Sequence, residues 1–189
     1  PAVWDMIEHD GSIYLATARG INEISTINQA VIPDRNKKYE PLISFQIYDL
    51  EADSTAMYLA TNAGLLKMNW DDEVIESLSK RKFTKIKLDN NNIIASDGDL
   101  WRIGNNNSET YLTSHSNEFT FYENYIWTIQ NDMAVLLDTT TSQTWDYSQE
   151  DGIQGNRIFG LDCDENWVWF LTNKGVAFYN WSRWHYVKN

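Results

Sequence analysis

The stretch that decides the fold lies near the end of the chain and reads Trp169-Phe170-Leu171-Thr172-Asn173-Lys174-Gly175. It consists of an aromatic residue, two apolar residues, a threonine, two variable residues and a glycine. The same order occurs as Tyr14-Leu15-Ala16-Thr17-Ala18-Arg19-Gly20 and as Tyr58-Leu59-Ala60-Thr61-Asn62-Ala63-Gly64. Weaker copies begin at Ile93 and Trp127. Self-similarity at a period of roughly 40 residues is the sequence signature of a repeat fold.

Each repeat has the periodicity of short strands. The last copy divides into four runs rich in Val, Ile, Phe, Tyr and Trp, which are Ile158–Asp162, Val168–Thr172, Gly175–Tyr179 and Arg183–Val187. Asn, Asp and Gly separate the runs, as expected of tight turns. The first strands of the other copies are predicted at Val3–Glu8, Ser44–Asp49, Phe83–Leu88 and Phe119–Tyr122. The segment Asp71–Lys82 is read as an outer strand with a charged loop, and a helix is the alternative.

Four antiparallel strands repeated about five times predict an all-β chain, a β-propeller of about five four-stranded antiparallel blades. The predicted blades cover approximately residues 1–42, 43–81, 82–116, 117–155 and 156–189. Neighbouring blades stack face to face and bury their aromatic side chains between them. This accounts for the 9 Trp, 10 Tyr and 7 Phe without a ligand. Trp169 is expected between two blades.

Composition excludes several classes of partner. The chain has 27 Asp and Glu against 15 Lys and Arg, a formal net charge of −12, which argues against nucleic acid and anionic membrane surfaces. No run approaches the roughly 18 apolar residues of a spanning helix. A single cysteine, Cys163, excludes an intrachain disulfide and a Cys-rich metal site. The chain starts at Pro1 without an initiating Met, so we expect a segment of a longer polypeptide.

The repeat resembles that of the two-component regulator propeller family. The likeness is carried by Gly152-Ile153-Gln154-Gly155-Asn156-Arg157-Ile158-Phe159-Gly160-Leu161-Asp162 and, after a turn, by Trp167-Val168-Trp169-Phe170-Leu171-Thr172-Asn173-Lys174-Gly175-Val176. The resemblance implies a bacterial, periplasmic sensor region of a hybrid two-component system, many of which sense oligosaccharides. Such rings often have seven blades. Five repeats therefore leave two possibilities open, a closed five-bladed ring or an arc of a larger ring.

The candidate ligand-binding residues lie in turns and links, because loops on a rigid scaffold carry recognition. Their mixed hydrogen-bonding chemistry suits a neutral polyol such as a sugar, and the alternative is that they are ordinary solvated turn residues. The candidates are Arg19, Asn62, Asp97, Asp132 and Lys174 in the second-to-third turns, with Gln154, Asn156 and Arg157 on the last link between blades. Trp145, Trp181 and Trp184 either stack on sugar rings or pack between blades.

The sequence nominates no metal site, cofactor or catalytic residue. The segment Asp162–Asn166 alternates carboxylates but lacks the glycine and distal glutamate of a calcium loop. His9, His115 and His185 fall in different repeats without ligand spacing. No Gly-x-Ser-x-Gly elbow occurs, and 27 acidic residues cannot be reduced to one catalytic pair by sequence alone.

These observations predict a non-enzymatic, extracytoplasmic module that senses a carbohydrate or another small polar ligand. A structural scaffold that binds proteins is one alternative, and a propeller lyase or glycosidase is another. The expected partners are a small polar ligand, such as an oligosaccharide, or a protein, with no nucleic acid. No membrane insertion is expected in this segment, and the full-length protein is expected to form a homodimer.

Overall fold

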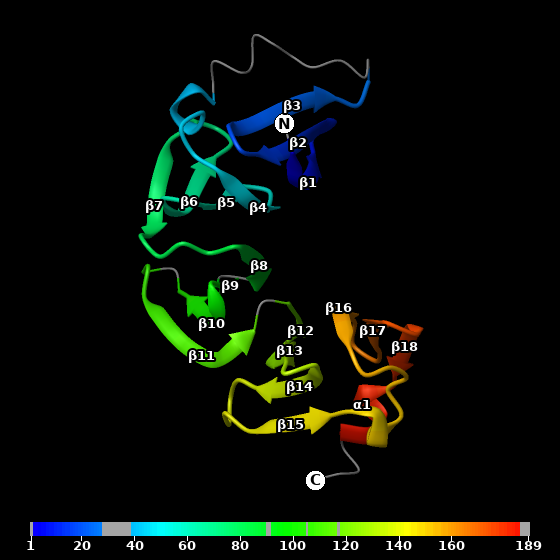
Figure 1. Cartoon of the computed structure of the whole chain (residues 1–189). Coiled ribbons are helices and arrows are strands. Elements are labelled where there is room, and N and C mark those ends of the chain that lie inside the picture. Colours follow the sequence, from blue (N-terminus) through cyan, green and yellow to red (C-terminus); the bar gives the residue numbers. More distant parts are fainter. Residues whose placement is uncertain (1, 28–38, 90–91, 105, 117, 186–189) are drawn as a thin grey trace. The chain divides into compact units, whose positions relative to one another are not determined.

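The computed structural model describes residues 2–27, 39–89, 92–104, 106–116 and 118–185, and these form five antiparallel sheets (Figure 1). Two compact units make up the chain, one of residues 1–97 and 102–110 and the other of residues 98–101 and 111–189. Each sheet is a meander whose strands follow sequence order. The all-β, five-bladed β-propeller arrangement of mostly four-stranded antiparallel sheets is thereby confirmed.

The blades are numbered 1 to 5 along the chain. Blade 1 has β1 (Val3–His9), β2 (Ser12–Thr17) and β3 (Gly20–Ser25), and blade 2 has β4 (Ile47–Ala52), β5 (Ala56–Thr61), β6 (Gly64–Asn69) and β7 (Ile75–Ser79). Blade 3 has β8 (Lys85–Asp89), β9 (Asn92–Ser96), β10 (Gly98–Ile103) and β11 (Glu109–Ser116). Blade 4 has β12 (Phe119–Tyr122), β13 (Tyr125–Gln130), β14 (Met133–Asp138) and β15 (Thr144–Tyr147), and blade 5 has β16 (Ile158–Cys163), β17 (Val168–Thr172) and β18 (Gly175–Tyr179). Among the described residues, the helices are η2 (Glu40–Leu42), η3 (Gln149–Asp151) and α1 (Trp181–His185).

The repeated threonine closes the turn between the second and third strands. In blade 5 the Thr172 hydroxyl donates to the carbonyl of Gly175 at 2.9 Å and accepts from the backbone N–H of Lys174 at 3.2 Å. Thr17 and Thr61 donate in the same way, to Gly20 and Gly64, each at 2.8 Å. A side-chain hydroxyl that bonds its own turn is a recurrent way of satisfying local backbone groups. The Thr-x-x-Gly pattern is therefore a turn motif.

Blade 4 builds this turn without glycine. Asn131 and Asp132 occupy its centre with φ of 51° and 63°. Positive φ at both central residues is the type I′ hairpin, which Asn and Asp tolerate better than other non-glycine residues. The departure of this copy from the glycine pattern therefore leaves the hairpin intact.

The strand predicted at Phe83–Leu88 begins two residues later, at Lys85, and two other expected strands differ more from the structure. The first strand of blade 2 begins at Ile47 and not at Ser44, because Pro41 starts a 3-10 turn whose last hydrogen bond runs from the Phe45 N–H to the Leu42 carbonyl at 3.0 Å. Helix α1 replaces the start of the strand predicted at Arg183–Val187, and residues 186 and 187 lie outside the described residues.

Side-chain contacts explain why a helix forms there. The Asn180 side chain accepts from the Arg183 N–H at 3.1 Å, as a capping residue does. The Trp181 indole N–H donates to the Asp164 carbonyl at 3.0 Å, and Trp181 is buried.

Two further expectations concern outer strands. Asp71–Lys82 contains the outer strand β7, so the strand interpretation of this segment is confirmed over the helix. A fourth strand for blade 1 would fall partly in residues 28–38, which lie outside the described residues.

Each unit has its own apolar core. Tyr14, Leu50, Leu59 and Met68 are among the buried residues of the first unit. The second core joins blades 4 and 5, and its centre is the fully buried Trp127, whose ring centroid lies 5.7 Å from that of Phe170 in an edge-to-face contact. Such a contact between large rings is worth more than its buried area alone.

Trp169, which we expect between two blades, is not covered by another blade within the described part of the chain. Trp169 keeps 36% of its surface exposed. It occupies the repeat position that Trp127 occupies in blade 4, but Trp127 is covered by blade 5, whereas no later blade follows Trp169 in the described chain.

Candidate functional site

Side-chain hydrogen bonds and a buried apolar residue fix the link between blades 4 and 5. Ser148 caps η3, since its hydroxyl accepts from the Glu150 N–H at 3.2 Å while its own N–H donates to the Asp151 carboxylate at 3.0 Å. This reciprocal pair is a capping box. The buried Ile153 then anchors the link in the core of blades 4 and 5. The link is therefore held by hydrogen bonds at Ser148 and by apolar packing at Ile153.

Asn173 fastens this link to the β17–β18 turn. Its side-chain oxygen accepts from the Asn156 N–H at 3.2 Å, and its side-chain nitrogen donates to the Asn156 side-chain oxygen at 2.8 Å. The Asn173 backbone N–H also donates to the Arg157 carbonyl at 3.1 Å. A Cβ at Gly155 would lie 2.7 Å from the Asn173 side-chain oxygen, so only glycine allows this approach. Sequence reasoning overlooked Asn173, although its counterpart Asn62 was nominated.

Two adjoining depressions border this link. The first has a volume of about 320 Å³ and the second about 420 Å³. They share the lining residues Gln149, Ile153 and Gly155. The first is also lined by Asn131, Asp132, Met133, Ser148, Glu150, Asn156 and Ile158, and the second by Gly152, Gln154 and Lys174. Carboxylate, amide and ammonium groups thus surround a small apolar floor.

Four of the eight nominated residues meet at these depressions. Asp132 comes from the β13–β14 turn, Gln154 and Asn156 from the link, and Lys174 from the β17–β18 turn. Arg157 follows on the link and places its guanidinium 5.3 Å from the centre of the Phe159 ring. We call the four residues Asp132, Gln154, Asn156 and Lys174 the link site.

The other three nominated residues belong to the first unit. Arg19 lies in the β2–β3 turn, where its backbone N–H donates to the Thr17 hydroxyl at 3.1 Å. The Asn62 side-chain oxygen accepts from the Gln46 N–H at 2.9 Å, and the Asn62 N–H donates to the Gln46 carbonyl at 3.0 Å. Asn62 therefore fastens the link that precedes blade 2, in the way that Asn173 fastens the link before blade 5.

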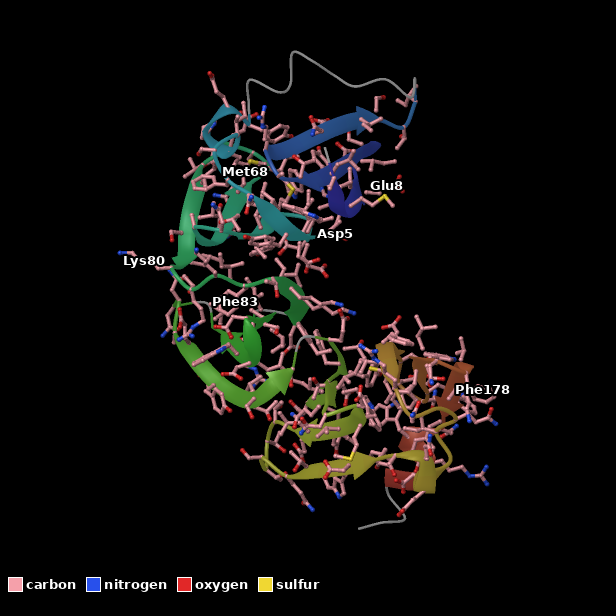
Figure 2. The ribbon with its side chains drawn as sticks, in the orientation of Figure 1. Asp5, Glu8, Met68, Lys80, Phe83 and Phe178 are labelled. Carbon is pink, nitrogen blue, oxygen red and sulfur yellow. The ribbon has the colours of Figure 1, made fainter. Side chains whose placement is uncertain are left out.

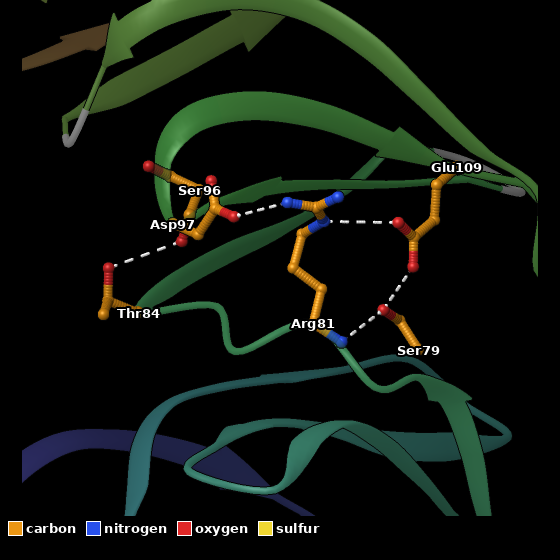
Figure 3. Close-up of polar contacts among 6 residues, drawn as sticks. All are labelled: Ser79, Arg81, Thr84, Ser96, Asp97 and Glu109. Carbon is orange, nitrogen blue, oxygen red and sulfur yellow. Dashed lines mark hydrogen bonds and ion pairs between the residues drawn. The ribbon is translucent and has the colours of Figure 1, made fainter.

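Asp97 takes part in an ionic network between blades 2 and 3 (Figure 3). The Arg81 guanidinium donates to the Asp97 carboxylate at 3.0 Å and to the Glu109 carboxylate at 3.2 Å. The Ser79 hydroxyl donates to Glu109 and accepts from the Arg81 backbone N–H. The carboxylate of Asp97 is therefore engaged with Arg81, and exposed pairs of this kind contribute little stability.

Two carboxyl groups tie the first strands of successive blades together in the first unit. The Asp5 carboxylate accepts from the Leu50 N–H at 2.9 Å, and the Asp49 carboxylate accepts from the Ile86 N–H at 2.7 Å. Burial raises the pKa of Asp49 to about 8, with a smaller contribution from the hydrogen-bonded Asp5 carboxyl, although the Ile86 N–H opposes the rise. Carboxyls in direct hydrogen-bond contact lie closer than the roughly 5 Å of a retaining glycosidase pair. Their geometry suits a structural tie.

A further cavity of about 450 Å³ lies within the first unit and was not anticipated from the sequence. The Asp53 turn forms one wall, where the Tyr58 hydroxyl donates to the Asp53 carboxylate at 3.0 Å. Burial and this hydrogen bond raise the pKa of Tyr58 to about 12. Lys67 and Glu76 also line this cavity. The polar sequence Asp53-Ser54-Thr55 is the one feature that could have indicated this cavity, but the same sequence is equally typical of an ordinary turn.

The other tryptophans and histidines that the sequence singled out either pack against neighbouring side chains or have side chains outside the described residues. Trp181 packs edge-to-face on Tyr125 at 5.4 Å between ring centroids, and Trp145 packs against the core of blades 4 and 5. The side chains of Trp184, His115 and His185 lie outside the described part of the chain. Within the described residues, no group of three or more His, Cys, Asp or Glu is placed to hold a metal. No described helix has the length and apolarity needed to cross a membrane.

Among the comparisons with known proteins, only the comparison with solved structures supports the fold. No family model and no curated protein sequence matches the chain. It is similar to the extracellular domain of the putative one component system BT4673 from B. thetaiotaomicron, with a TM-score of 0.70 at 12% identity over 93% of this chain and 27% of that one. For the extracellular domain of the putative hybrid two component system BT3049 from the same organism, the TM-score is 0.66 at 12% identity over 92% and 26%.

BamB from Moraxella catarrhalis is a third similar structure, with a TM-score of 0.65 at 15% identity over 94% of this chain and 58% of that one. The chain therefore spans from about a quarter to three fifths of these solved chains. The chain is a β-propeller that resembles the propellers of two-component systems. Identities this low show the fold alone.

Proposed function

We propose that this propeller is an extracytoplasmic ligand-sensing module that binds a carbohydrate at the link site. The observation that carries the proposal is the convergence of Asp132, Gln154, Asn156 and Lys174 from three separate segments on two adjoining depressions. A neutral sugar presents hydroxyls that both donate and accept hydrogen bonds. A carboxylate, two amides and an ammonium group match both roles.

The open shape and small apolar floor of the two depressions limit the affinity that we expect for a sugar. They are open at the surface, and their apolar floor is limited to a few side chains such as Met133, Ile153 and Ile158. Sites that enclose little of a ligand gain little from apolar burial. We expect dissociation constants on the order of 0.1–1 mM, about 4–5.5 kcal/mol of binding free energy.

The resemblance to sensor propellers supports the extracytoplasmic assignment. The similar BT4673 and BT3049 structures are extracellular domains, one of a putative one component system and the other of a putative hybrid two component system. The full reading frame tests this part of the proposal: a membrane helix and a histidine kinase encoded downstream would support it. A reading frame without either would favour a scaffold.

Isothermal titration against a panel of neutral and acidic oligosaccharides tests the binding itself. We expect Gln154→Ala and Lys174→Ala to weaken binding of the best ligand at least fivefold without changing the unfolding midpoint. Arg19→Ala is the matched control, since Arg19 holds the same turn position as Lys174 but lies outside the link site. No binding to any member, or an equal loss in the control, would contradict the proposal.

A further inference from the structure

The cavity of the first unit is a second candidate site, separate from the link site. Its volume of about 450 Å³ falls in the range of roughly 300–1,000 Å³ that is typical of small-molecule sites. Strands and turns of blades 2 and 3 line it, and all of its lining residues belong to the first unit. We call it the first-unit cavity.

One wall of the first-unit cavity is a row of three side chains across blade 2. Tyr58 on β5 pairs with Lys67 on β6, and Lys67 pairs with Glu76 on β7. Residues directly opposite each other on antiparallel strands have Cβ atoms about 4.5–5.5 Å apart. Neither the Lys67 ammonium nor the Glu76 carboxylate has a hydrogen bond or an ion pair with any of the described residues. Two opposite charges therefore stand side by side and are open to a ligand.

The other carboxylate at the cavity, that of Asp53, is already engaged. It accepts from the Thr55 N–H and the Thr55 hydroxyl, both at 2.7 Å, and from the Tyr58 hydroxyl at 3.0 Å. The Trp70 indole N–H donates to the Asp53 carbonyl at 2.9 Å. These contacts fix the turn as a wall, and they leave Glu76 as the carboxylate that can bind a cationic group.

The opposite side of the cavity is apolar. Ile93 and Ile103 line it and are only 5% and 2% exposed, and the partly buried Leu78 and Leu88 lie beside them. Glu76, in contrast, is exposed. A ligand with both charges at one end and an apolar group at the other matches this arrangement, because burial of the apolar group is favourable.

We propose that the first-unit cavity binds a free α-amino acid with an apolar side chain, such as leucine. Its carboxylate binds Lys67, its ammonium group binds Glu76, and its side chain packs against Ile93 and Ile103. Hydrogen bonds between charged partners are roughly twice as strong as those between neutral ones. A neutral sugar offers no counter-charge to Lys67 or Glu76 and no apolar chain to the isoleucines. The cavity and the link site therefore take different ligands.

Chemical-shift mapping of the whole chain with L-leucine tests this site. We expect the amides of residues 53–58, 76–78 and 92–93 to shift, and those of residues 149–157 in the link to stay unchanged. Glycine lacks the apolar side chain, N-acetyl-leucine lacks the ammonium group and leucinamide lacks the carboxylate, so each should bind at least fivefold more weakly. No shift at the cavity with millimolar leucine, shifts confined to the link, or glycine that binds as well as leucine would overturn the proposal.

Two variants assign the charges. Lys67→Met should weaken leucine binding at least fivefold but not the binding of leucinamide, which has no carboxylate. Glu76→Gln should weaken leucine binding by a similar factor but not the binding of N-acetyl-leucine, which has no ammonium group. Lys80→Met is the matched control, because Lys80 is exposed and lies outside the cavity (Figure 2). Leucine binding that survives Lys67→Met or Glu76→Gln, or an equal loss in the control, would overturn the assignment.

Discussion

Replacing two glycines at the same repeat position by alanine tests how the blades are built. Gly64 has a φ of 130° and Gly175 a φ of 118°, a region that residues with a side chain rarely adopt. A Cβ at Gly64 would overlap the carbonyl oxygen of Ser79 and come within 3.1 Å of the Lys80 Cα. A Cβ at Gly175 would meet nothing within 4 Å. The two glycines therefore share the backbone strain and differ in the space around them.

The magnitudes follow from this difference. Backbone strain costs about 1–3 kcal/mol at either site. At Gly64 the overlap adds roughly 1–3 kcal/mol, because the end of β7 must shift. Urea unfolding of the two alanine variants should show Gly64→Ala to be the less stable one, and the difference measures the packing of β7 on the turn. Equal losses, within about 0.5 kcal/mol, would refute the placement of β7 beside this turn.

Two further predictions concern the packing of blades and the carboxyl tie. Trp127→Ala should lower the free energy of unfolding by about 3–5 kcal/mol, whereas Trp169→Ala should lower it by less than about 1 kcal/mol; equal losses would mean that the exposed face of blade 5 is covered in solution. Because the folded-state pKa of Asp49 is raised to about 8, the folded chain holds a proton that the unfolded chain releases near pH 4, so stability should fall as the pH rises through this window. Urea unfolding at pH 5 and pH 9 should show a smaller pH difference for Asp49→Asn than for the parent, and an unchanged difference would contradict the buried tie.

The sequence predicted the blades because the strand pattern and the turn motif are local. A threonine and a glycine three residues apart are sufficient to close a hairpin, and Thr172 and Gly175 do so as expected. The helix α1 was missed because its cause is partly non-local. The Trp181 indole bonds the carbonyl of Asp164, which is 17 residues away in the sequence.

The sequence predicted where in the repeat the candidate residues lie, but not which of them come together at one site. All eight nominated residues lie in turns or links, as the repeat implied. Which of them share a depression depends on the path of the link, which Asn173 and Gly155 determine. Asp97 illustrates the limit: its engagement with Arg81, 16 residues away, could not be deduced from the repeat. The exposure of Trp169 is likewise not evident from its motif, which it shares with the buried Trp127.

The central claim is that the link site binds carbohydrate, and chemical-shift mapping of the backbone amides tests it most directly. Titration of the isotope-labelled chain with the best oligosaccharide should shift the amides of residues 131–133, 149–157 and 173–175, and leave the equivalent turns at Arg19 and Asn62 unchanged. Shifts that cluster at the first-unit cavity around Tyr58, or no shifts with any sugar at millimolar concentration, would contradict the account.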